Sequence, residues 1–215
     1  MRRPESFMPQ FKSSSLLAAM APHTTARPER PVLHVHPEGD PARARVEAYI
    51  HERYRQRFGA QLKHWMPSLV SLRIGEEILA AAGYRDAREP LFLERYLAAP
   101  IERYLSERGL PVARAHIVET GQFAAARPGA GRLLVPLLAD HLHRGGFEWA
   151  VGTLTKELHH LFSRMGLAHQ PLAIATARGL DAADRKDWGT YYEHEPKVFA
   201  GRLDAILAHI PEREA

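Results

Sequence analysis

A strand-like apolar run, a pair of glycines and an amphipathic helix pattern follow one another directly in the middle of the chain. The run "ARAHIVETGQFAA" covers residues 113–125, and Gly129 and Gly131 come next, separated by one residue. From Arg132 to His143 the apolar positions recur at helical spacing. A helix that opens from a glycine turn leaves unpaired N–H groups beside that turn. The stretch therefore predicts either a cradle for a phosphate group or an ordinary tight turn.

Patterns typical of strands and helices alternate along the rest of the chain. A first strand is predicted at Val32–His36, followed by a helix from Pro41 to Phe58 with Asp40 as its N-cap. Residues 68–87 predict a hairpin that turns at Gly75-Glu76. The alternation predicts an α/β domain. Further strands are predicted at 147–154, 172–178 and 188–193, and further helices at 155–167, 196–210 and 90–110, the last broken at Pro100 and ended by Gly109.

Length and composition favour one domain with a tail. The chain has 215 residues, of which 45% are hydrophobic and 25% charged, as in ordinary globular proteins. Residues 1–30 are rich in Pro, Ser and Arg without an apolar period, so they predict a disordered basic tail before a single domain at 31–215. The net charge of +4 is small and partly located in this tail. It does not indicate a nucleic-acid partner.

Several classes of protein are excluded or disfavoured by what the sequence lacks. The absence of cysteine excludes disulfides, a thiolate nucleophile and Cys-ligated metals. No apolar run approaches the roughly 20 residues of a transmembrane helix. The segment "LLAAMA" near the start is too short for a signal peptide, so we expect a cytoplasmic protein. Neither His-Glu-x-x-His nor Gly-x-Ser-x-Gly occurs, and no metal cofactor is expected.

Two phosphate-binding motifs can be excluded for the glycine pair. A Walker loop requires Lys-Ser/Thr after its last glycine, but Arg132-Leu133 follow Gly131. A dinucleotide fingerprint requires a third glycine where Leu134 stands.

The stretch resembles instead the pyrophosphate loop of GNAT acyltransferases, in which a Gly-x-Gly turn opens a helix and grips coenzyme A. The following residues keep the GNAT register, since Thr155, Phe162 and Gly166 stand where those enzymes have Asn, Tyr and Gly. The resemblance implies a mixed central sheet flanked by helices. It also implies coenzyme A or acyl-phosphopantetheine as the acyl donor, bound by Phe123, Ala124, Arg127, Gly129, Ala130, Gly131, Arg132 and Thr155.

Two positions depart from the GNAT pattern. Ala126 replaces the usual Arg or Gln before the first glycine, and Arg127 comes one place late. Phe162 replaces the tyrosine that protonates the leaving thiolate in many of these enzymes. Because a phenyl ring cannot donate a proton, another group or solvent must fill that role, or the protein is a non-catalytic acyl-CoA sensor.

Three further segments resemble the bacterial thermostable hemolysin family. They are "AAAGYRDAREPLFLERYLAAPIE", "IVETGQFAA" and "WGTYYEHEPKVFAGRL", which keep their order over about residues 46–203. This resemblance implies the same GNAT-like fold, while the family name implies membrane lysis. The segment "ETGQF" is also similar to the Glu-x-x-Arg-Phe segment of acyl-homoserine-lactone synthases, with Gln122 in place of the arginine.

The resemblance implies an acyltransferase that uses acyl-CoA or acyl carrier protein and acylates a small amine or amino-acid-like acceptor. Glu119 is the expected base or amine anchor, with Glu94 as a second candidate; the alternative for Glu119 is a strand-edge carboxylate paired with arginine. Trp188, Tyr191 and Tyr192 are candidates for the acceptor pocket, although such a cluster also suits an apolar core. Lysis, direct or through a lipid-like product, is the alternative function, and a homodimer stays open.

Overall fold

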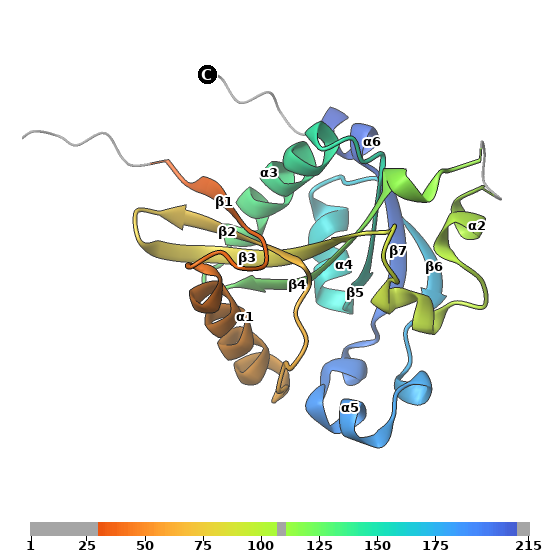
Figure 1. The fold of residues 1–215 in the computed structure, drawn as a ribbon, viewed down its shortest axis with the longest axis horizontal. Helices are drawn as coiled ribbons and strands as arrows, with labels where there is room; N and C mark the ends of the chain where they lie inside the picture. The colour runs from red at the N-terminus through yellow and green to blue at the C-terminus, as the bar shows by residue number, and fades with distance from the viewer. Residues whose placement is uncertain (1–29, 107–110, 210–215) are drawn as a thin grey trace, which may run out of the picture.

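The structure, a computed structural model, describes residues 30–106 and 111–209. Within them, the centre is a seven-stranded sheet in the order β1-β2-β3-β4-β5-β7-β6 (Figure 1). Neighbouring strands pair antiparallel except β4 and β5, which are parallel, so the sheet is mixed as predicted. The strands are β1 Val32–His36, β2 Ser68–Ile74, β3 Glu77–Asp86, β4 Ile117–Ala125, β5 Trp149–Leu154, β6 Gln170–Ile174 and β7 Lys197–Arg202.

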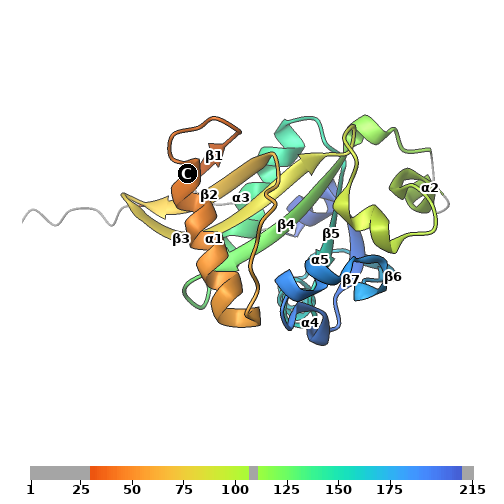
Figure 2. The ribbon, with the colours of Figure 1, turned by 60° about the horizontal axis from the view of Figure 1, so that its bottom comes forward.

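Helices cover both faces of this sheet. α1 packs on β2, β3 and β4 from one side, and α3 packs on the same strands from the other side (Figure 2). Successive residues of β2 alternate accordingly, since Leu69 belongs to the core under α1 whereas Val70 belongs to the core under α3. The helices are α1 Arg43–Phe58, α2 Ile101–Ser106, α3 Ala130–Arg144, α4 Lys156–Arg164, α5 Ala182–Asp187 and α6 Leu203–Ala208, with 3-10 turns η1 Phe92–Tyr96, η2 Arg114–His116, η3 Ala177–Gly179 and η4 Tyr191–His194.

Most of the predicted elements are confirmed. The first strand has the predicted bounds, the hairpin of β2 and β3 turns at Gly75-Glu76, and α3 begins at Ala130, so that it includes Gly131 and starts two residues earlier than predicted. α1 begins at Arg43, later than predicted, with Ala42 as its N-cap, so the prediction of Asp40 as the N-cap is wrong. Asp40 instead accepts a hydrogen bond from the Ala42 amide (2.7 Å) in the turn before the helix. The predicted helix at 90–110 is in fact η1 and α2, separated by the extended Leu97 and a bend at residues 98–99 before Pro100, and Gly109 lies outside the described residues.

The predicted strand at 188–193 is wrong. Trp188 follows the end of α5, Gly189 has a positive φ of 54°, and Tyr191 begins η4. The Thr190 amide donates to the Phe58 carbonyl at the end of α1 (2.8 Å), so this segment packs on a helix rather than on a strand. Its aromatic residues, which suggested a strand, instead fill the core cluster under α1.

The predicted helix at 196–210 is wrong in its first half, where β7 lies between β5 and β6. Val198 and Ala200 are buried in the sheet, and a side chain at Gly201 would lie 2.8 Å from the Ala168 carbonyl oxygen. A strand buried on both faces lacks the alternation by which sequence identifies strands. The helix is limited to α6, and β6 ends at Ile174 rather than at residue 178.

The expected tail at 1–30 lies almost entirely outside the described residues, which begin at Arg30. Across the described ranges, every helix is too short or too polar to cross a bilayer.

Candidate functional site

The parallel strands β4 and β5 pair over a short stretch and then separate. Pairing covers Ile117–Thr120 on β4 and Trp149–Gly152 on β5. The approach is close, because a side chain at Gly152 would lie 2.6 Å from the Thr120 carbonyl oxygen. The opening beyond these pairs is the centre of the candidate site.

A bulge in β4 lies at this opening. The register with β3 shifts between Ala81 and Gly83, and Gln122 adopts a left-handed φ of 54°, which is uncommon for a residue with a side chain. Its side-chain amide nitrogen donates to the His64 backbone carbonyl oxygen (2.8 Å), and its side-chain oxygen accepts from the Met66 backbone N–H (3.3 Å). Gln122 therefore holds residues 59–67, hereafter the connecting segment, against β4.

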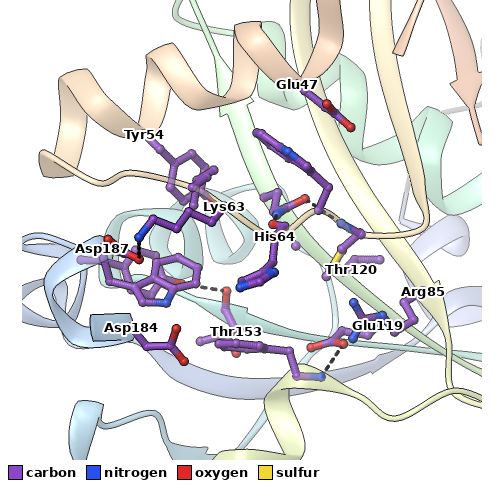
Figure 3. A pocket seen from close by; sticks show the side chains of 18 of the residues that line it. Glu47, Tyr54, Lys63, His64, Arg85, Glu119, Thr120, Thr153, Asp184 and Asp187 are labelled. Atoms are coloured by element: carbon purple, nitrogen blue, oxygen red, sulfur yellow. Dashed lines mark hydrogen bonds and ion pairs between the residues drawn. The ribbon is translucent and has the colours of Figure 1, made fainter. Parts of the chain in front are cut away.

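A cavity of about 670 Å³ lies between α1, the connecting segment, β4 and α5 (Figure 3). Both Trp65 of the connecting segment and Trp188 line it, together with Phe92 and Tyr96 of η1. A second cavity of about 240 Å³ lies between the diverging ends of β4 and β5. Tyr54, Gln122, Thr153 and Tyr191 line both cavities, which therefore adjoin across the opening.

Glu119 lies in the wall of the larger cavity on β4. The side chain is buried, with 3% of the residue exposed, and its carboxylate accepts hydrogen bonds from the backbone N–H groups of Phe92 (3.0 Å) and Leu93 (2.9 Å). Burial raises the pKa of the Glu119 carboxyl, although these bonds and the charge of Arg85 oppose the rise. A carboxylate with a raised pKa is a stronger base at the wall of a cavity.

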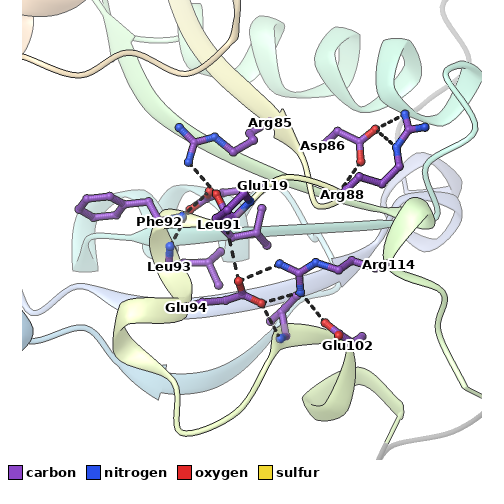
Figure 4. A network of polar contacts seen from close by, with 12 residues as sticks. Arg85, Asp86, Arg88, Leu91, Phe92, Leu93, Glu94, Glu102, Arg114 and Glu119 are labelled. Atoms are coloured by element: carbon purple, nitrogen blue, oxygen red, sulfur yellow. Dashed lines mark hydrogen bonds and ion pairs between the residues drawn. The ribbon is translucent and has the colours of Figure 1, made fainter.

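Glu94, the other predicted carboxylate, does not line either cavity. It forms a two-oxygen ion pair with Arg114 (2.7 and 2.8 Å) and accepts from the Ile101 N–H at the start of α2 (3.0 Å), as Figure 4 shows. Arg114 also pairs with Glu102 (2.6 Å). The Arg114 guanidinium is the main reason that the pKa of Glu94 is lowered. These contacts tie η1 and α2 to η2, which directly precedes β4.

The predicted phosphate loop lies at the N-terminus of α3. Gly129 is the N-cap with a positive φ of 90°, and no side chain caps the helix. A side chain at Gly129 would meet nothing within 4 Å, so the approach to the first turn is open. Arg132 is exposed in that turn, whereas Arg127 is paired with Glu77 (2.5 Å). Ala130 is buried in the core between α3 and the sheet.

The other predicted donor-binding residues connect this loop to the cavities. Phe123 and Thr155 line the smaller cavity, and Thr155 also caps α4 by accepting from the Leu158 N–H (3.4 Å). Leu161 of α4 lines the same cavity and would lie 3.4 Å from a side chain at Gly131. Ala124 is buried in the core under α1 instead. Phe162, at the position of the missing tyrosine, packs edge-on against Phe123.

Two of the three predicted aromatic residues line the larger cavity, and the third does not. Trp188 and Tyr191 line the larger cavity, and both belong to the core cluster under α1. Tyr192 lies outside the lining, and its hydroxyl is hydrogen-bonded to that of Tyr96 (2.6 Å). Burial raises the pKa of Tyr191 and of Tyr54, so both hydroxyls stay protonated at neutral pH.

Sequence reasoning missed several residues of the larger cavity. Arg85 pairs in register with Glu119 across β3 and β4, and Tyr54 reaches the cavity from α1. Arg85 lies within "GYRD", which carried the family resemblance, so its polar side chain beside Glu119 was a usable signal. Tyr54 gave none, since its spacing fits an ordinary core position. No group of three potential metal ligands occurs in the described parts of the chain.

Comparisons with known proteins identify the fold. Residues 36–207 match the family model described as thermostable hemolysin. The acyl-homoserine lactone (AHL) synthase LasI shares 12% identity with a TM-score of 0.56, covering 87% of this chain and 100% of that chain. FeeM, an N-acyl amino acid synthase from uncultured soil microbes, shares 13% with a TM-score of 0.55, covering 81% and 92%. MesI, a CoA-dependent acyl-homoserine lactone synthase, shares 12% with a TM-score of 0.54, covering 83% and 92%.

These likenesses confirm the predicted GNAT-like fold. No curated protein matches the sequence.

Proposed function

The chain belongs to the thermostable hemolysin family and has the fold of GNAT-like acyltransferases, and from this premise we propose that it transfers an acyl group to a small amine. The donor is acyl-CoA or acyl carrier protein, which carry the same phosphopantetheine arm. MesI is CoA-dependent and supports the first of these donors. We place the reaction in the cytoplasm.

The observation that carries this proposal is the path across the separated strands. A phosphate bound at the open N-terminus of α3 would lie beside Gly131, which is next to Leu161 in the wall of the smaller cavity. An arm that continues past Phe123 and Thr155 enters the larger cavity, where Glu119 lies. The path therefore brings a thioester from a phosphate site to a buried carboxylate.

The chemistry follows from these positions. The amine nitrogen attacks the thioester carbonyl carbon, a C–N bond forms and the C–S bond breaks. Glu119 accepts the proton that the amine loses. The leaving thiolate requires a proton that Phe162 cannot supply. The proton that Glu119 takes from the amine balances the one that the thiolate needs, and we assign its transfer to solvent in the adjoining cavities. Burial makes the hydroxyls of Tyr54 and Tyr191, which line both cavities, weaker acids than a thiol.

Thermal unfolding with CoA and with acyl-CoAs of increasing chain length tests the donor site. A ligand bound only by the folded state stabilises it by about 2.7 kcal/mol at a hundredfold excess over Kd. We expect a shift for the wild type and for Gly131→Gln, and its loss in Gly131→Glu, whose carboxylate repels phosphate at equal size. Equal shifts in both variants, or none in the wild type with either CoA or carrier-protein donors, would contradict the proposal.

The family name calls for a separate test of lysis. Dye release from phosphatidylcholine vesicles by the purified protein, with and without decanoyl-CoA and an amine, separates direct lysis from lysis by a product. We expect release only with both substrates present. Prompt release without a donor would favour the direct lytic function. Steady-state formation of free CoA beyond one equivalent per protein would exclude a non-catalytic sensor.

A further inference from the structure

Arg85 faces the same cavity as Glu119. The two residues are direct register partners on β3 and β4, so their side chains leave the sheet on the same face, about 5 Å apart at Cβ. Both line the larger cavity, and Figure 3 shows the guanidinium beside the Glu119 carboxylate. One wall of the cavity thus presents a cation and an anion side by side.

The hydrogen-bonding capacity of Arg85 is largely unused. A guanidinium has five N–H donors. That of Arg85 donates one hydrogen bond, from NH1 to the Pro90 carbonyl oxygen (3.0 Å). Its Nε is buried and has no partner. Among the described residues, no carboxylate lies within 4.0 Å of it as an ion pair. Leaving a buried donor without a partner costs free energy, which an oxygen atom of a ligand that reaches this guanidinium would offset.

The other cations that line the cavity are already paired. Arg43 donates to Glu47 and to three backbone carbonyl oxygens. Lys63 pairs with Asp187 (2.6 Å), and Arg95 pairs with Asp184 (3.3 Å). Arg85 is therefore the lining arginine or lysine without a carboxylate partner in the described part of the chain.

We propose that Arg85 binds the carboxylate of the acceptor, and that the acceptor is an α-amino acid whose amine lies at Glu119. This inference rests on the proposed acyl transfer and names its acceptor class. The adjacent amine and carboxylate of an α-amino acid match the adjacent anion and cation of the wall. A guanidinium binds a carboxylate through two parallel hydrogen bonds, which also fix the direction in which the amine points. Arg85 then determines specificity, while Glu119 accepts the proton.

The test compares L-amino acids with the amines that lack only the carboxylate, such as L-phenylalanine with phenethylamine and L-leucine with 3-methylbutylamine. Each is offered with decanoyl-CoA, and kcat/KM is measured for each amide product. We expect the wild type to prefer the amino acid at least tenfold, and Arg85→Met to reduce that preference to within about threefold. Arg85→Lys should retain part of it. Arg144→Met, which removes a cation paired with Asp140 (3.0 Å) outside both cavities, is the control and should retain all of it.

Two readouts separate failure of this inference from failure of the proposed function. Retention of the decanoyl-CoA thermal shift shows that each variant is folded and binds donor. Thermal shifts of the CoA-saturated protein by the amino acid and by its amine measure acceptor binding without turnover. An amine acylated as well as its amino acid, a preference that survives Arg85→Met, or no larger shift with the amino acid would overturn the inference. Loss of the donor shift in the wild type would instead contradict acyl transfer itself.

Discussion

The environments of Glu119 and Glu94 shift the pKa values of their carboxyl groups in opposite directions. Glu119 is buried and bonded to two neutral N–H groups, and burial raises its carboxyl pKa. Glu94 is paired with Arg114, which lowers its carboxyl pKa. Both residues involve η1: Glu119 accepts hydrogen bonds from its backbone, and Glu94 is part of it. Their titrations should therefore act on stability in opposite directions.

The pH dependence of stability tests this pair. Because the folded-state pKa of Glu119 is raised, its contribution is fully present below the ordinary value of 4.5 and is lost as the pH rises through the folded value. The wild type should therefore lose stability relative to Glu119→Gln as the pH rises from 4.5. For Glu94 the folded pKa is lowered, so the wild type should lose stability relative to Glu94→Gln as the pH falls below 4.5. Urea denaturation between pH 3 and pH 8 measures both.

The same two variants separate the base from the supporting carboxylate in turnover. Glu119→Gln should reduce kcat/KM by about 10²–10⁴ without loss of the donor thermal shift. Glu94→Gln should retain the pH dependence of the wild-type rate. A wild-type rate that does not rise with pH above 4.5, or an active Glu119→Gln enzyme, would contradict the role of Glu119 as base.

At the level of elements, the connecting segment is held over the cavity by a few contacts. The Gln122 side chain binds its backbone at two positions. The Asp187 carboxylate pairs with Lys63, and the Asp187 backbone carbonyl oxygen accepts from the Gln61 N–H (2.6 Å). Lys63 itself is exposed, with 61% of its side chain accessible. The segment contributes Leu62, Trp65 and Met66 to the cavity wall, so ligands that fill the cavity pack against it.

Trypsin cleavage after Lys63 reports on this segment. We expect Asp187→Asn to increase the cleavage rate about two- to fivefold, the range of an exposed ion pair, and decanoyl-CoA to reduce it. Glu195→Gln is the matched control, because it removes a comparable exposed pair with Lys156 (3.1 Å) away from the segment. A rate that Asp187→Asn leaves unchanged would show that the pair does not hold the segment.

The elements also show which parts of the fold could be predicted from sequence. The Gly129 turn and α3 have strong local signals, since glycine accommodates the positive φ and the helix is amphipathic. β7 and η4 do not, because the neighbours that determine them, β5 and α1, are distant in sequence. Among the candidate site residues, Glu119 was found through a motif. Arg85 lies in a motif of the family, but only the sheet places it opposite Glu119, and Tyr54 becomes notable only when α1 brings it to the same cavity.

For the whole molecule, the family match and the described structure cover nearly the same residues. The first strand begins at Val32 and the match begins at residue 36, whereas the expected tail precedes both. We propose that residues 31–215 form one domain. A chain that starts at Arg30 should therefore unfold in one transition at the same temperature as the full chain, by calorimetry, and keep the donor shift. A lower unfolding temperature would show that the first 29 residues stabilise the domain.

Two of the three tryptophans of the chain, Trp65 and Trp188, line the larger cavity, and the third, Trp149, lies on β5 outside both cavities. Indole emission depends on the polarity around the ring, so water displaced from this cavity should change the colour and intensity of the light that the protein emits. The molecule thus carries its own optical reporter of occupancy. Mixing it rapidly with unlabelled donors and acceptors would follow their arrival in real time and reveal which of the two enters first.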